Sequence, residues 1–284
     1  MQAWTNQKFV TVPEQATVSQ ISPDFCLFET FALRGGRVES PEVHEARMMS
    51  GLDHLNLDKT KLYLSFSNKL HHWGPILKNL LSTEKLTDAI VRWMVIPNID
   101  GTLTEWVTIR PLPATPPSID LFLLKTIRDN AEWLPRPKTG PWKNSQAALD
   151  ELKNLSPRLD VEGIQYDQHG NISDCTRSAL VWWDGTEWFT PSKETQCLSS
   201  TSLQTFQNSL RSKKQIKAVA QSFPYHAQSL IVLRSTFEGG AVLVKNVFNS
   251  DGESVWTAQP NQEEARSALT HLKEFRAQRS VSLL

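Results

Sequence analysis

A lysine and an aspartate are the two side chains whose types and spacing best suit chemistry. Lys138 lies in a proline-bracketed loop, Pro135-Arg136-Pro137-Lys138-Thr139-Gly140-Pro141, and Asp174 follows it 36 residues later. A neutral lysine amine attacks a carbonyl carbon to form a Schiff base, and a carboxylate keeps a nearby nitrogen cation protonated. Lysine is normally charged, so burial or a neighbouring cation must favour its neutral form. Lys143, five residues further on, is the competing nucleophile.

Three other segments carry groups suited to binding an anion. The first is His44-Glu45-Ala46-Arg47, because an arginine fork gives a phosphate two parallel hydrogen bonds. The second is Ser199-Ser200-Thr201-Ser202, which opens an expected helix whose N-terminal amides would face an anion. The third is Ser235-Thr236. Taken alone, Arg47 fits an exposed arginine on an amphipathic helix better. A simple Ser/Thr helix cap explains the Ser200 segment nearly as well, and the alternative for Asp174 is a surface aspartate beside a turn.

The bulk composition indicates a soluble enzyme. The chain has 284 residues, enough for two modest domains, and its 30 basic and 30 acidic residues cancel. We therefore expect no nucleic acid and no membrane as partner, since no overall field attracts them and no apolar run could span a bilayer. No secretory signal pattern is visible, and three scattered cysteines match neither a disulfide framework nor a zinc site. We expect a cytoplasmic protein without a metal.

Hydrophobic periodicity and turn residues predict helices and strands in both halves of the chain. We expect helices at 44–55, 83–91, 145–155, 199–210 and 263–277. We expect strands at 25–33, 37–38, 91–96, 161–166, from 171 onward, 179–183, 187–190, 229–233 and 241–247. The fold class is therefore α/β or α+β.

Four prolines in seven residues, Pro111-Leu112-Pro113-Ala114-Thr115-Pro116-Pro117, predict an extended connection. Proline fixes φ and has no amide donor, so neither a helix nor a central strand accommodates this run. We place the domain boundary here. Residues 1–115 would form a small N-terminal α/β domain, and residues 116–284 a larger C-terminal domain that binds the cofactor.

The segments around these residues resemble the fold-type-IV pyridoxal 5'-phosphate (PLP) enzymes, that is, the class IV aminotransferase and aminodeoxychorismate lyase family. Phe28-Glu29-Thr30, a diglycine turn and His44-Glu45-Ala46-Arg47-Met48 look like the family's strand, turn and helix with its His-x-x-Arg motif. Residues 161–191 are similar to the family's block of two hairpins, which contains an acidic residue and ends in Thr-Pro. The resemblance implies a two-domain fold like that of D-amino-acid aminotransferase and PLP as cofactor.

The resemblance also implies roles for single residues. Lys138 matches the Schiff-base lysine, and Asp174 matches the carboxylate that faces the pyridine nitrogen, where the family usually has glutamate. Thr30 matches a threonine that assists the lyase reaction. The residues implied to bind the cofactor phosphate are Arg47, Ser200, Thr201, Ser202, Ser235 and Thr236.

Two departures from the family pattern concern anion binding. In the phosphate box, Ser200 stands where the family has glycine and Leu203 where it has arginine. Many members also carry a Thr-Arg-Gly-type turn whose arginine receives substrate carboxylates, and this chain reads Val95-Ile96-Pro97-Asn98 there. The usual carboxylate clamp is therefore missing from its place.

Three functions fit this resemblance, and the two enzymatic ones take a small-molecule amino substrate. The first is an aminodeoxychorismate lyase-like enzyme of folate biosynthesis, which eliminates pyruvate and leaves 4-aminobenzoate, with Lys138 moving the proton. The second is an aminotransferase acting on a branched-chain or other small amino acid. The third is a diverged, non-catalytic member that acts through protein contacts. A homodimer is expected by resemblance alone.

Overall fold

The chain folds into two compact units. The computed structural model describes residues 1–12, 25–130, 136–140, 143–210 and 215–284. The first unit comprises Met1–Pro113, Pro137–Trp142 and Arg276–Leu284, and the second comprises Ala114–Arg136 and Lys143–Phe275. The chain thus passes between units inside the proline run, and two later segments return to the first unit. The domain boundary at residue 115 stays a prediction.

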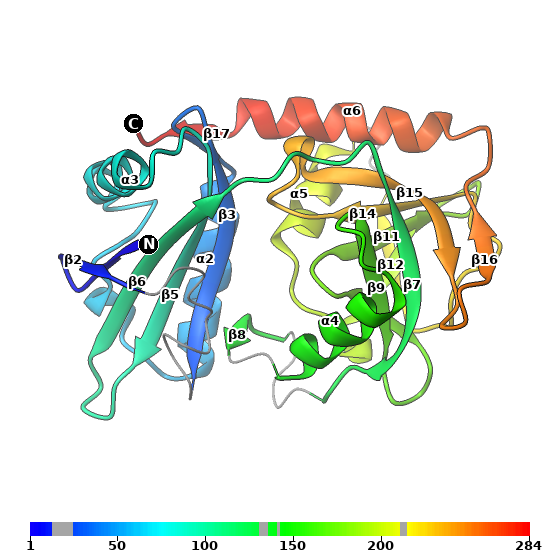
Figure 1. The fold of residues 1–284 in the computed structure, drawn as a ribbon, viewed down its shortest axis with the longest axis horizontal. Coiled ribbons are helices and arrows are strands. Elements are labelled where there is room, and N and C mark those ends of the chain that lie inside the picture. Colours follow the sequence, from blue (N-terminus) through cyan, green and yellow to red (C-terminus); the bar gives the residue numbers. More distant parts are fainter. Residues whose placement is uncertain (13–24, 131–135, 141–142, 211–214) are drawn as a thin grey trace. The chain divides into compact units, whose positions relative to one another are not determined.

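An antiparallel sheet of eight strands forms the first unit (Figure 1). Its strands are β1 (Gln2–Thr5), β2 (Lys8–Thr11), β3 (Cys26–Arg34), β4 (Arg37–Glu39), β5 (Ala89–Pro97), β6 (Leu103–Pro111), β8 (Thr139–Gly140) and β17 (Ser280–Ser282). The order is β17-β4-β3-β5-β6-β1-β2, and β8 pairs with β3. The helices are α2 (Pro41–His54), α3 (Leu70–Glu84) and the short 3-10 turn η1 (Lys59–Lys61).

The two faces of this sheet differ in what covers them. Side chains alternate along a strand, so Leu27 and Phe31 of β3 point to one face, which we call the first face. There they pack in one cluster with Met48 of α2 and Trp73 of α3. The opposite, second face carries a smaller apolar cluster around Phe28, formed by Cys26, Phe28 and Met94 with Ile96 and Trp106 against it.

A mixed sheet of nine strands forms the second unit. Its strands are β7 (Ser118–Ile127), β9 (Val161–Tyr166), β10 (Ile172–Cys175), β11 (Ala179–Trp183), β12 (Trp188–Pro191), β13 (Ile216–Val219), β14 (Ser229–Leu233), β15 (Ala241–Phe248) and β16 (Ser254–Thr257). The order is β10-β9-β7-β15-β14-β11-β12-β13, and β16 pairs with β15. The helices are α4 (Lys143–Leu155), α5 (Thr201–Ser209) and α6 (Glu263–Gln278), with 3-10 turns η2 (Lys193–Thr195) and η3 (Glu238–Gly240).

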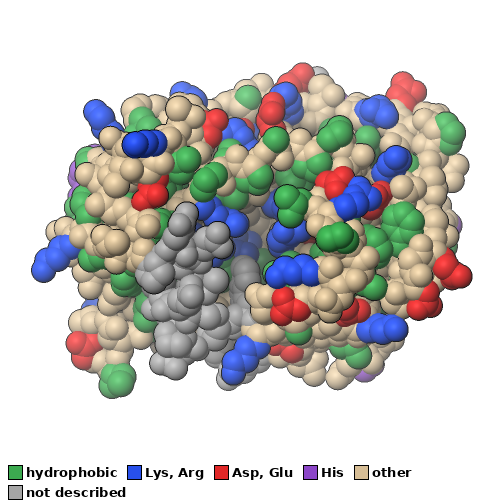
Figure 2. Space-filling model, in the orientation of Figure 1, with side chains coloured by type: hydrophobic (Ala, Val, Ile, Leu, Met, Phe, Trp, Pro, Cys, Tyr) green, Lys and Arg blue, Asp and Glu red, His purple; other side chains and the backbone are tan. Residues whose placement is uncertain are grey.

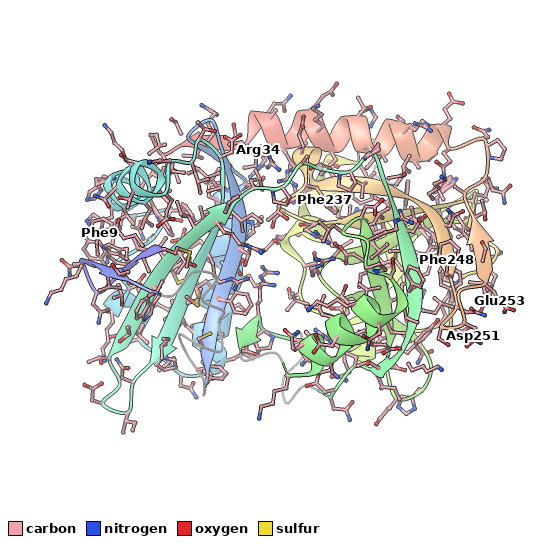
Figure 3. The ribbon with its side chains drawn as sticks, in the orientation of Figure 1. Phe9, Arg34, Phe237, Phe248, Asp251 and Glu253 are labelled. Atoms are coloured by element: carbon pink, nitrogen blue, oxygen red, sulfur yellow. The ribbon has the colours of Figure 1, made fainter. Side chains whose placement is uncertain are left out.

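Strand alternation also sorts the core of the second unit into separate clusters. Val181 and Ile231 pack with Phe206 of α5 and Leu272 of α6 on one side of the sheet. Leu180 and its neighbours form a second cluster, and α4 covers Phe122 and Leu124 of β7 in a further one. Phe248, labelled in Figure 3 at the end of β15, stacks on Phe122 with 5.2 Å between the ring centroids.

The expected elements are confirmed wherever a strong local period marked them. The strand expected at 25–33 is β3, the helix at 44–55 is α2, and the helix at 263–277 is α6. The helix expected at 83–91 is wrong. Residues 70–84 form α3 instead, which ends where Lys85 takes a left-handed conformation (φ 54°), and the β-branched Ile90-Val91 already belongs to β5.

The charged surface agrees with the balanced composition. Figure 2 shows Lys and Arg side chains interspersed with Asp and Glu side chains over the face in view. Within the described ranges, no helix has the length and apolar character needed to cross a membrane.

Candidate active site

Strand β3 carries a buried carboxylate on the first face of its sheet. Glu29 is 1% exposed and accepts hydrogen bonds from Arg47 Nε and Nη2, both at 2.6 Å, and from His44 Nδ1 at 2.7 Å. His44 and Arg47 lie three residues apart on α2, so both side chains reach the same carboxylate. Glu29 therefore fixes the guanidinium that the sequence assigned to phosphate binding.

The charge states of this cluster follow from its burial and its contacts. Burial alone would raise the pKa of Glu29, but the Arg47 guanidinium and the hydrogen bonds from Arg47 and His44 lower it to about 2. Burial lowers the pKa of His44 despite the nearby carboxylate, so the imidazole is neutral at pH 7. Ionised Glu29 can only accept, so His44 Nδ1 is the donor.

Lys138 is held against β3 by backbone pairing. Phe28 N donates to Lys138 O at 3.1 Å, and Thr139 and Gly140 continue the pairing as β8. The Lys138 Nζ lies 4.9 Å from the centroid of the Phe28 ring, which is a cation–π contact. The amine is therefore placed over the apolar cluster of the second face.

Arg92 of β5 shares the same ring. Its guanidinium carbon lies 5.5 Å from the Phe28 centroid, and its Nε is buried. Among the residues that the structure describes, no acidic side chain pairs with it and no acceptor meets Nε. Burial, with Arg110 nearby, lowers the pKa of Arg92 to about 10, so it stays charged at pH 7. A partly buried guanidinium that has no acidic partner among the described residues suits an anionic ligand.

Arg92 was not among the residues singled out from the sequence. It lies in Ala89-Ile90-Val91-Arg92-Trp93-Met94, which the strand assignment explained. The signal that could have found it is a single charge inside an apolar central strand, since arginine is seldom buried without a partner. The turn after β5, where the family's carboxylate arginine is missing, is closed by its own groups, with Asn98 N donating to Thr102 O at 2.9 Å.

The placements of three further residues bear on the choice of nucleophile and helper. Thr30 lies directly opposite Arg92 in the pairing of β3 with β5, on the second face. Lys143 is exposed at the first residue of α4, in the second unit, whereas Lys138 is half-buried. Arg136 pairs with Asp129 at 2.7 Å, so its charge is already compensated. These placements favour Lys138 over Lys143.

Asp174 lies on β10 in the second unit and is 8% exposed. Its Oδ2 accepts from Leu198 N at 3.0 Å and lies 3.5 Å from Arg128 Nη2. Its Oδ1 is buried and, in the described part of the chain, meets no hydrogen-bond donor. Burial, and to a lesser extent the Asp174 charge, raise the pKa of Cys197 to about 12, so that thiol stays protonated. The orphaned oxygen is the main chemical feature of this site.

The phosphate-box residues open helix α5. Ser200 is its N-cap, and the Ser200 Oγ accepts from Leu203 N at 3.1 Å. Thr201 and Ser202 are buried in the first turn, where helix amides present donors to an anion. The Ser200 hydroxyl oxygen is thus engaged as a cap, while its neighbours occupy the positions expected of anion-binding residues.

Ser235 and Thr236 lie in the turn after β14, followed by Phe237, which is labelled in Figure 3. Arg234 begins the turn and lies over the Phe237 ring at 4.3 Å, while its guanidinium pairs with the fully buried Glu162. A buried ion pair therefore fixes the start of the segment that carries the two hydroxyls.

The structure brings some of the expected residues together and separates others. In the first unit, Lys138, Thr30 and Arg92 share the second face, whereas Arg47 bonds to Glu29 on the first face. In the second unit, Asp174 bonds to the amide two residues before Ser200. No cluster of three metal-ligating side chains occurs in the described ranges.

The model of the amino-transferase class IV family matches residues 26–240, well over half of the chain. The chain belongs to this family. A member of this family is a PLP-dependent transaminase or lyase, so the predicted family, enzyme class and cofactor are confirmed. No curated protein matches the sequence.

Solved structures show the same fold at low sequence identity. A hypothetical aminotransferase from Mycobacterium tuberculosis in a PLP-bound form is 16% identical with a TM-score of 0.71, over 98% of this chain and 99% of that one. The Escherichia coli branched-chain amino acid aminotransferase is 14% identical, TM-score 0.71, over 95% and 91%. A candidate 4-amino-4-deoxychorismate lyase from Legionella pneumophila is 13% identical, TM-score 0.71, over 93% and 96%. The predicted fold class is confirmed.

The side chains of this class IV family member fit PLP chemically. A protonated pyridine nitrogen is a hydrogen-bond donor. The buried Asp174 Oδ1 is an acceptor that meets no donor among the described residues. Phosphate in proteins is commonly bound by helix N-termini and by arginine side chains. This chain offers the first turn of α5 and Arg47. A half-buried lysine amine is available in Lys138.

The Glu29 cluster predicts how stability depends on pH. Replacing Glu29 with Gln removes the charge that Arg47 and His44 satisfy, so we expect the free energy of unfolding to fall by roughly 3 kcal/mol at pH 7. A carboxylate with a depressed pKa contributes stability above its unfolded value near ~4.3 and loses it as the pH falls through about 2. The difference between the two proteins should therefore shrink between pH 4.5 and 2 in urea titrations. A constant difference would contradict the assigned charge state.

Proposed function

We propose that the protein is a PLP-dependent aminotransferase for a small amino acid with an apolar side chain. One observation carries the proposal: Arg92 lies charged, buried at Nε and without an acidic partner among the described residues, over the ring that the Lys138 amine contacts. Around this cation the second face is apolar, with Met94 and Trp106 close to Phe28. An α-amino acid with an aliphatic side chain offers a carboxylate and an apolar group to such a surface.

Arg92 takes the task of the missing Thr-Arg-Gly arginine in this proposal. A guanidinium binds a carboxylate through two parallel hydrogen bonds. It is also more weakly hydrated than an ammonium, so it suits a site that is partly removed from water. The desolvation of Arg92 is already present in the folded chain, and the incoming carboxylate supplies the counter-charge. The substrate would thus be oriented with its amino group toward the Lys138 side of the Phe28 ring.

The remaining roles follow from the chemistry of each side chain. When bound, PLP supplies an electron sink for the electrons of the substrate Cα–H bond. Lys138 would hold the cofactor and move the proton at the substrate Cα. Asp174 Oδ1 would accept the pyridine N–H and favour the protonated form of that nitrogen. The groups suited to its phosphate would be Arg47 in the first unit, and the first turn of α5 with Ser235 and Thr236 in the second.

A second candidate is the aminodeoxychorismate lyase reaction. Thr30 favours it, because this residue lies directly opposite Arg92 on the face that carries the Lys138 amine. In the lyase a hydroxyl at this position would assist the proton transfer that releases pyruvate. Both candidates use the same lysine, carboxylate and arginine. We further propose a cytoplasmic location, which suits the three scattered cysteines, and the homodimer that the family resemblance implies.

The choice of nucleophile is tested by removing each lysine. Lys138→Ala should abolish the yellow absorbance of the lysine-linked cofactor and leave the fold intact, because the backbone pairing of Lys138 with β3 does not need its side chain. Lys143→Ala is the matched control, and its exposed position predicts an unchanged spectrum. Loss of the absorbance in Lys143→Ala alone would reverse the assignment.

The role of Asp174 is tested by neutralising it at constant shape. Asp174→Asn should still bind PLP through the lysine and phosphate contacts, while turnover falls by a factor of roughly 100 or more, because the pyridine nitrogen loses its anionic partner. Asp174→Glu restores the residue usual in the family and should retain activity. Cofactor content and turnover are measured in both variants. Equal turnover in the wild type and Asp174→Asn would make Asp174 an ordinary turn residue.

The role of Arg92 is tested by substrates with and without a carboxylate. The wild type should prefer an apolar α-amino acid over the matching amine, and Arg92→Met should lose this preference by a factor of roughly 10 to 100 in kcat/KM. Arg92→Lys keeps the charge without the fork and should lose less. Pyruvate release from aminodeoxychorismate, measured beside amino transfer to a 2-oxo acid, decides between the two reactions. An unchanged preference in Arg92→Met would remove the observation on which the proposal rests.

A further inference from the structure

The arrangement of Glu29, His44 and Arg47 shows a buried ion pair that packing alone does not require. Glu29 lies on the first face of β3 between Leu27 and Phe31, which are both buried apolar residues. A well-packed apolar residue at such a site is commonly as stabilising as a buried ion pair. The charge therefore has a use other than holding α2 against the sheet.

The direction of the hydrogen bonds indicates that use. Glu29 Oε1 accepts from Arg47 Nε and Glu29 Oε2 from Arg47 Nη2, so the carboxylate covers one edge of the guanidinium. The other edge, formed by Nη1 and Nη2, is directed away from Glu29 by the planar geometry of the group. The Arg47 side chain is 10% exposed, whereas that of Glu29 is 1% exposed. Glu29 thus holds the Arg47 guanidinium from its more buried side.

His44 supplies the third hydrogen bond to the Glu29 carboxylate. Its Nδ1 donates to Oε2 at 2.7 Å, and its pKa is lowered, so it adds a neutral donor and no second positive charge. The Glu29 carboxylate is ionised down to about pH 2. The orientation of Arg47 is therefore the same throughout the range in which an enzyme operates.

We propose that Glu29 is a positioning residue for phosphate recognition, which it serves by fixing the edge of Arg47 that receives the phosphate of PLP. This inference rests on the proposed role of Arg47. A long arginine side chain otherwise loses rotamer freedom when it binds an anion. Glu29 and His44 remove that cost in advance, so the cofactor meets an arginine already held in one orientation.

The test compares the affinity for PLP with the affinity for pyridoxal, which lacks the phosphate. Both are measured by equilibrium dialysis on the full chain after removal of its cofactor. Glu29→Gln should weaken PLP binding by a factor of about 10 to 100, the value of a charge-assisted hydrogen bond, and leave pyridoxal binding within about twofold. The ratio of the two affinities is independent of the fraction of folded protein. Equal loss for both ligands, or no loss for either, would overturn the proposal.

A matched control separates positioning from general loosening of the unit. Glu105 is also a buried glutamate of the first unit, 3% exposed, but it accepts from Trp93 Nε1 and from backbone amides, and no arginine in the described ranges pairs with it. Glu105→Gln should leave the PLP-to-pyridoxal ratio unchanged. A fall in that ratio as large as in Glu29→Gln would show that the effect is not specific to Arg47, and would overturn the proposal.

Two further variants distinguish this inference from the proposed function. Arg47→Met should abolish the preference for PLP, and if it does not, the phosphate role of Arg47 fails. If Arg47→Met acts and Glu29→Gln does not, only the positioning role fails. The double variant should match Arg47→Met alone, since Glu29 acts through Arg47, and an additional loss would contradict this route. Should Glu29→Gln fail to fold, Glu29→Asp keeps the charge at a shorter reach and should show a smaller fall in the ratio, with an unchanged ratio counting against the proposal.

Discussion

The alternation of side chains along β3 is the constraint on which the candidate site of the first unit depends. Consecutive residues of a strand point to opposite faces, so Phe28 and Thr30 face one way and Glu29 the other. The pairing of β8 with this strand brings Lys138 to the Phe28 side, and α2 brings Arg47 to the Glu29 side. A register shift of one residue would exchange the two sets of groups. The short Phe-Glu-Thr segment thus serves both faces of the sheet.

Two buried carboxylates and one partly buried guanidinium differ in how far the chain compensates their charges. Glu29 is fully compensated by Arg47 and His44. Asp174 has one oxygen satisfied by Leu198 N, while the other meets no donor among the described residues. Arg92 has only the Phe28 ring and, in the described chain, no acid. An unsatisfied buried polar group costs about 1 to 3 kcal/mol, so these two sites gain most from a ligand of complementary charge.

The fold could be predicted where local chemistry decides the structure, and failed where tertiary packing does. The helix at 44–55 and the strand at 25–33 have clear periods and turns, and both were found. Helix α3 was missed because it lacks a side-chain cap, begins at Leu70-His71-His72 and contains Pro75, so its helical form depends on burial of Trp73 and Leu77 against the sheet. The motif residues could be read from the sequence by resemblance, and their roles stay predictions. Arg92 was passed over because the strand assignment explained its segment. The single charge in an apolar strand was the available signal, but its lack of an acidic partner among the described residues shows only once β5 is placed beside β3.

The departures from the family pattern can be weighed against the idea of a non-catalytic member. Ser200 replaces a glycine, but its hydroxyl caps α5 by accepting from Leu203 N, so the N-terminus of the helix is still stabilised. Aspartate at 174 is one methylene shorter than glutamate, yet its Oδ1 is buried and meets no hydrogen-bond donor among the described residues. A chain that served only protein contacts would gain stability by replacing Asp174 and Arg92 with apolar residues, because neither is fully compensated by its described neighbours. The free energy that these two groups cost is recovered when a cation meets the first and an anion meets the second, which is the demand that a PLP ring and an amino-acid substrate make.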